Sequence, residues 1–100
     1  MSVLVIGKFQ GDTAKFQQAL TDRAGEFAKA AEMARSEGAI HHRFGIGDGV
    51  VMIVDEWETA ERFQQFFSNP DLQDFIASVG AAPTPPEITI TAAVASADQF

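Results

Sequence analysis

Two adjacent histidines, His41 and His42, are the only histidines in the chain and its strongest candidates for acid–base chemistry. Imidazole exchanges protons near neutral pH, which suits proton abstraction from an acidic, phenol-like substrate. Neighbouring side chains of a strand point to opposite faces, so the pair is not expected to bind one metal ion. Arg43 shares a face with His41 and could steady an anionic intermediate. We therefore take His41, His42 and Arg43 as catalytic candidates; the alternative is that one histidine is exposed or at a subunit interface and the other packs in the sheet.

A second set of candidates is aromatic: Trp57 ends an apolar segment, and Phe63 and Phe67 follow it. Their simplest role is to close the core, with the indole N–H bonded locally. Aromatic side chains also line pockets for apolar ligands, which makes these three the candidate ligand-binding residues. Asp55 and Glu56 are adjacent on one strand, so their side chains point to opposite faces of the sheet. We therefore expect a polar pair or salt-bridge partners at the strand end and no carboxylate dyad.

The composition excludes several function classes. A formal net charge of −7, with only seven Lys and Arg, provides no basic patch for nucleic acid and disfavours anionic membranes. The absence of cysteine removes disulfides, thiolate metal sites and iron–sulfur clusters, and Gly45–Gly49 reads as a hairpin turn and not as a phosphate-binding loop. We expect no cofactor and no metal. The N-terminus has no basic region typical of a signal peptide, and no apolar run could span a membrane, so we expect a cytoplasmic protein.

The elements that must position these residues follow from hydrophobic periodicity and turn signals. We predict a helix from Asp12 or Thr13 to about Ser36, two short helices after Thr59 and at Pro70, and strands over 2–9, 39–46, 50–57 and 88–94. The order β-α-β-β-α-β, with its second helix in two parts, is the ferredoxin-like arrangement of the α+β class. It predicts one domain over residues 1–100, with a four-stranded antiparallel sheet and helices on one face.

The first and third predicted strands are apolar on both of their faces, as the runs Val3–Ile6 and Val50–Val54 show. Helices on one side of the sheet can cover only one of those faces. Large exposed apolar patches are unusual on monomers, and two sheets packed face to face would bury both. The sequence therefore predicts a two-fold homodimer.

The segment Val54-Asp55-Glu56-Trp57, followed by Ala60-Glu61-Arg62-Phe63 and Phe66-Phe67, resembles the dimeric α/β-barrel superfamily, in particular its antibiotic-biosynthesis-monooxygenase-like (ABM-like) branch. The order of elements matches over about residues 2–95. The resemblance implies a homodimeric barrel with a pocket between helices and sheet in each subunit for an aromatic, polyketide-like or haem ligand. It also implies that a Trp can sit near the ligand, and that oxygenation can proceed without a metal or flavin.

Haem degradation does not fit the residues. Haem-degrading members of the family pair such a Trp with an Asn on the first strand and a His on the second helix, and this chain has neither. Two functions stay open. One is a cofactor-independent monooxygenase, or a binder, of a small aromatic or polyketide-like molecule. The other is a non-catalytic dimeric structural or stress-related interaction module, whose barrel is filled by its own side chains and leaves no cavity for a drug-sized ligand.

Overall fold

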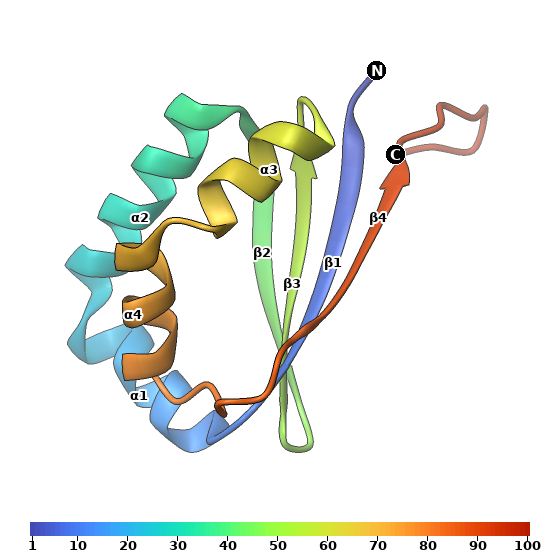
Figure 1. The fold of residues 1–100 in the computed structure, drawn as a ribbon. Coiled ribbons are helices and arrows are strands. Elements are labelled where there is room, and N and C mark those ends of the chain that lie inside the picture. The colour runs from blue at the N-terminus through green and yellow to red at the C-terminus, as the bar shows by residue number, and fades with distance from the viewer.

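The computed structural model describes residues 1–100 as one antiparallel sheet covered by four helices (Figure 1). The strands are β1 (Val3–Gln10), β2 (Ala39–Gly47), β3 (Val50–Trp57) and β4 (Glu87–Ala92). The helices are α1 (Thr13–Asp22), α2 (Ala24–Glu37), α3 (Ala60–Phe67) and α4 (Pro70–Ser78).

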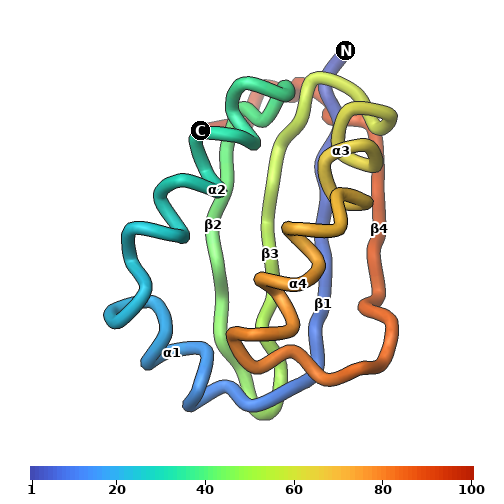
Figure 2. Tube along the Cα trace, turned by 60° about the vertical axis from the view of Figure 1, so that its left-hand side comes forward, coloured from blue at the N-terminus to red at the C-terminus, as the bar shows by residue number.

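The strands lie in the order β2-β3-β1-β4, and each neighbouring pair is antiparallel. All four helices cover the same face of the sheet, with α2 along the β2 side and α3 and α4 in front of the remaining strands (Figure 2). The predicted ferredoxin-like α+β arrangement is therefore confirmed.

The predicted starts of the helices are confirmed by their caps. Asp12 accepts a hydrogen bond from the backbone N–H of Lys15 at 3.0 Å, and Thr59 accepts one from that of Arg62 at 3.1 Å. Asn69 caps α4 immediately before Pro70. These side-chain oxygens satisfy backbone donors that the first helical turn leaves free.

The single long helix predicted after Asp12 is wrong, because the chain breaks it into α1 and α2 at Arg23, whose φ and ψ are −122° and 31°. The Arg23 guanidinium donates to Glu26 and to the hydroxyl of Ser78, the last residue of α4, at 2.7 Å. It also lies 5.0 Å from the centroid of the Phe75 ring. Arg23 at this break contacts residues far along the chain, and the periodicity of the helix cannot predict such contacts.

The core lies between the sheet and the helices in two small clusters. One contains Val5, Ile53, Trp57 and Phe63, and the other Phe16, Ala19, Val51 and Val79. No residue of α2 is buried, whereas a helix packed closely on a sheet would bury a stripe. The helical layer therefore does not fill the space above β2.

The opposite face of the sheet, here called the outer face, is open and apolar at its centre. Leu4, Ile6 and Val54 are 41%, 40% and 44% exposed there. They belong to the two central strands, as the two-sided apolar pattern predicted. No helix of the structure combines the length and the apolar character needed to cross a membrane.

Candidate functional site

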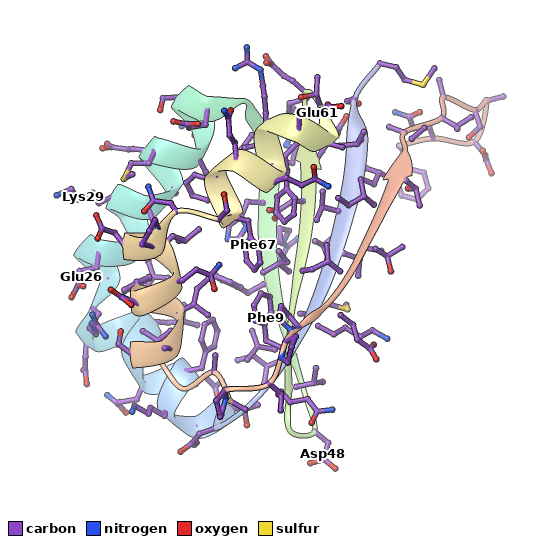
Figure 3. All side chains as sticks on the ribbon, in the orientation of Figure 1. Phe9, Glu26, Lys29, Asp48, Glu61 and Phe67 are labelled. Carbon is purple, nitrogen blue, oxygen red and sulfur yellow. The ribbon has the colours of Figure 1, made fainter.

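A cavity of about 630 Å³ lies between the helices and the sheet. It is lined by every phenylalanine of the chain except Phe100, and by Trp57. Figure 3 shows two of these rings, Phe9 and Phe67, in the space between the layers, and their centroids are 6.0 Å apart. This volume falls within the range of about 300–1,000 Å³ typical of small-molecule sites.

The cavity opens along the edge strand β2. Ile40, His42 and Phe44 border it, and all three stay at least a third exposed although α2 runs along the same side. Because β2 is an edge strand and α2 does not pack closely against it, the cavity is uncovered on the β2 side.

One polar cluster stands in this aromatic wall. The His42 imidazole Nδ1 lies 2.6 Å from Asp55 Oδ1, and the Trp57 indole N–H donates to Asp55 Oδ2 at 3.1 Å. Asp55 is 7% exposed and is the only buried charged residue, while Trp57 is 1% exposed. We call these three residues the His42–Asp55–Trp57 relay.

An irregularity in β2 decides which histidine meets Asp55. Ala39 pairs with Trp57, but His41 already pairs with Glu56, so one extra residue is accommodated between Ala39 and His41. Such a bulge shifts the alternation of side chains along the strand. As a result Ala39, expected on the opposite face from His42, shares the helix-facing side with it, and His42 stands directly opposite Asp55.

With Asp55 ionised, the two hydrogen bonds fix how the relay holds its protons. An ionised carboxylate only accepts, so both of its partners must donate. His42 therefore carries a proton on Nδ1, and in the neutral ring Nε2 keeps its lone pair. The His42 side chain is 40% exposed, and its ring centroid is 4.6 Å from that of Phe44. The relay thus places one proton acceptor at the open side of an apolar cavity.

The structure separates the candidate residues. His42, Trp57, Phe63 and Phe67 line the cavity. His41 also lines part of the cavity, although it pairs with Glu56, a residue of the outer face, while Arg43 pairs with Val54 on that face and does not line the cavity. Trp57 and Phe63 are at the same time core residues, as the packing interpretation expected.

Asp55 is the site residue that sequence reasoning missed. Its predicted role as a strand-end salt-bridge partner is met by His42, but its position at the cavity wall was not expected. The sequence did contain a signal for this position: Asp55 and Trp57 are two residues apart, which places both side chains on one face of β3. No three His, Asp or Glu side chains are placed to hold a metal ion together.

Solved structures share this architecture at low sequence identity. SnoaB, a cofactor-independent oxygenase from Streptomyces nogalater, is 14% identical over 98% of both chains, with a TM-score of 0.66. The monooxygenase ActVA-Orf6 of Streptomyces coelicolor, in complex with nanaomycin D, is 15% identical over 99% of this chain and 93% of its own, with a TM-score of 0.70. Rv0793 from Mycobacterium tuberculosis is 18% identical over 98% of this chain and 100% of its own, with a TM-score of 0.63.

These likenesses establish the fold. The chain has the ferredoxin-like fold of ABM-like structures, as the sequence resemblance predicted. No protein-family model matches the chain, and no curated protein matches it.

Proposed function

We propose that this protein oxygenates a small hydroxylated aromatic molecule in its cavity without a bound cofactor, with His42 as the base. The observation that carries the proposal is the His42–Asp55–Trp57 relay in a mostly apolar wall. The fold is that of a cofactor-independent oxygenase and of a monooxygenase solved in complex with nanaomycin D. A self-filled interaction module would leave no such cavity, so the volume of about 630 Å³ favours the ligand-binding function.

The chemistry needs one proton acceptor and a substrate that becomes electron-rich when it loses a proton. His42 Nε2 removes a proton from an acidic C–H or O–H of the substrate, and Asp55 stabilises the imidazolium that forms. The substrate anion gives two electrons to O₂ as a C–O bond forms, and the resulting peroxide takes up a proton. Loss of water from the peroxide leaves a ketone, so a CH₂ group and O₂ become C=O and H₂O.

Oxygen uptake with anthrones and hydroquinones tests this proposal. General-base catalysis contributes roughly 10²–10⁴-fold, so we expect His42→Ala to lower kcat/KM at least about a hundredfold. The matched change His41→Ala removes the neighbouring imidazole on the outer side of the strand and is expected to retain most of the activity. Equal losses in both variants, or no uptake by the unaltered protein, would contradict the assignment.

We also propose that two copies pack through the outer face. The exposed side chains of Leu4, Ile6 and Val54 form a continuous apolar centre on the two middle strands. Residues of both charge signs share that face, including Arg43 and Glu56, so a two-fold partner could pair opposite charges. The lack of cysteine fits a reducing compartment, and the cytoplasm stays the proposed location.

A further inference from the structure

We propose that the cavity selects uncharged, hydroxyl-bearing aromatic ligands over aromatic carboxylates, and that Asp55 determines this selection. The inference rests on the proposed function, since it names the class of molecule that the same cavity admits. It comes from the charges around the cavity, which are few and unevenly placed.

Asp55 is the only charged side chain buried in this wall. Its two oxygens bond His42 and Trp57, and with a neutral imidazole neither partner cancels its negative charge. The other ionisable residues at the cavity are Asp12, Arg35 and His41, and all three are exposed. No lysine borders the cavity, so Arg35 is its only permanent positive charge, and it lies in the last turn of α2.

A carboxylate ligand would meet this arrangement at a disadvantage. Its ring would lie among the phenylalanines, and its charge would lose water without gaining a buried cation. Asp55 would repel it across a partly desolvated space, where charges interact more strongly than in water. A hydroxyl group carries no such penalty, because it can donate to the free Nε2 of His42 and remain uncharged.

Trp57 makes the selection measurable. It is the only tryptophan, the chain has no tyrosine, and the indole lines the cavity, so quenching of its fluorescence reports binding there. The matched probes are 2-(hydroxymethyl)anthraquinone and anthraquinone-2-carboxylate, which share one ring system and differ in charge. Both are fully oxidised, so binding is measured without turnover, at about pH 8.5, where imidazole is ordinarily neutral.

We expect the alcohol to bind at least about tenfold more tightly than the carboxylate, a difference of about 1.4 kcal/mol. The ratio should persist at about 0.5 M NaCl, which screens the net charge of the surface more than a buried group. In Asp55→Asn the ratio should fall at least about threefold, because the repulsion is lost while the cost of desolvating the carboxylate remains. Asp48→Asn removes the same charge at the exposed tip of the β2–β3 hairpin and should leave the ratio unchanged (Figure 3).

A third probe keeps the test decisive if Asp55→Asn does not fold. (Anthraquinon-2-ylmethyl)trimethylammonium carries a permanent positive charge and should bind the unaltered protein at least as tightly as the alcohol. A carboxylate that binds as well as the alcohol, recruited by Arg35 for example, would overturn the proposal, as would the absence of binding by all probes. A protein that orders the probes as expected but consumes no oxygen would contradict the proposed function alone.

Discussion

At the residue scale, the site depends on one buried carboxylate that accepts from two side chains. The sequence singled out both histidines, and only the irregularity before His41 decides that His42 meets Asp55. Bulges depend on how two strands pair, so alternation within a single strand does not reveal them. Asp55 was missed for a related reason: it was compared with Glu56, its neighbour on the opposite face, and not with Trp57, which shares its face.

The relay predicts a specific tautomer. Because Asp55 accepts at His42 Nδ1, neutral His42 should carry its proton on Nδ1 and leave Nε2 bare. Nitrogen-15 NMR of the imidazoles at about pH 8.5 measures this directly, and a His41→Gln sample assigns the two rings. In Asp55→Asn the Trp57 indole N–H resonance should move as well, since its acceptor changes. A His42 ring protonated on Nε2 would contradict the proposed role as a base.

At the element scale, caps and turns were predictable because they depend on a few neighbouring residues. The break at Arg23 was not, because the guanidinium contacts Ser78 and Phe75 of a helix about fifty residues further along the chain. Gly25 is the second residue of α2 and lies in its first turn, two residues after the break. Gly25 and Gly80 differ in backbone conformation and in the space around them, so alanine should affect stability differently at the two positions.

Gly25→Ala should stabilise the protein by roughly 0.5–1 kcal/mol, because alanine is the better helix former. A Cβ at this position meets nothing within 4 Å. Gly80→Ala should instead destabilise it, because Gly80 has φ +113° and an added Cβ would lie 2.8 Å from the carbonyl oxygen of Asp12. Urea unfolding followed at Trp57 compares the two, and a destabilising Gly25→Ala would contradict a helical conformation at Gly25.

The Arg23–Glu26 pair predicts a local titration. The hydrogen bond from the Arg23 guanidinium lowers the pKa of the Glu26 carboxyl below its ordinary 4.5. A lowered carboxyl pKa means that the contribution of the pair is present above pH 4.5 and is lost as the pH falls through the lowered value. NMR titration of Glu26 should show the lowered pKa, and Arg23→Gln should return it toward 4.5. An unchanged midpoint in that variant would rule out Arg23 as the cause.

At the scale of the whole molecule, the four-stranded antiparallel sheet and its helix-covered face followed from periodicity and topology, whereas the cavity did not. The sequence has nine phenylalanines, and eight of them line the cavity. Whether such rings fill the space or line it depends on how far the helices stand from the sheet, and that is a property of the assembled layers. The open apolar outer face, by contrast, was predictable from two strands with no polar side.

The outer face leads to a prediction about assembly. We expect the protein to elute as a dimer at micromolar concentration, and Val54→Lys to convert it to a folded monomer, because this side chain lies at the centre of the outer face. Met33→Lys is the matched control, since Met33 is similarly exposed at 43% but lies on α2, away from that face. Light scattering coupled to gel filtration decides between them, and an unaltered protein of monomer mass would contradict the proposal.

The fate of molecular oxygen tests the central claim most directly. The protein, treated with a chelator, is incubated with an anthrone under ¹⁸O₂, and the product is analysed by mass spectrometry. We predict one labelled oxygen in the new carbonyl group, with the yield lost in His42→Ala and kept in His41→Ala. Unlabelled product, or labelled product formed equally well by His42→Ala, would contradict the account.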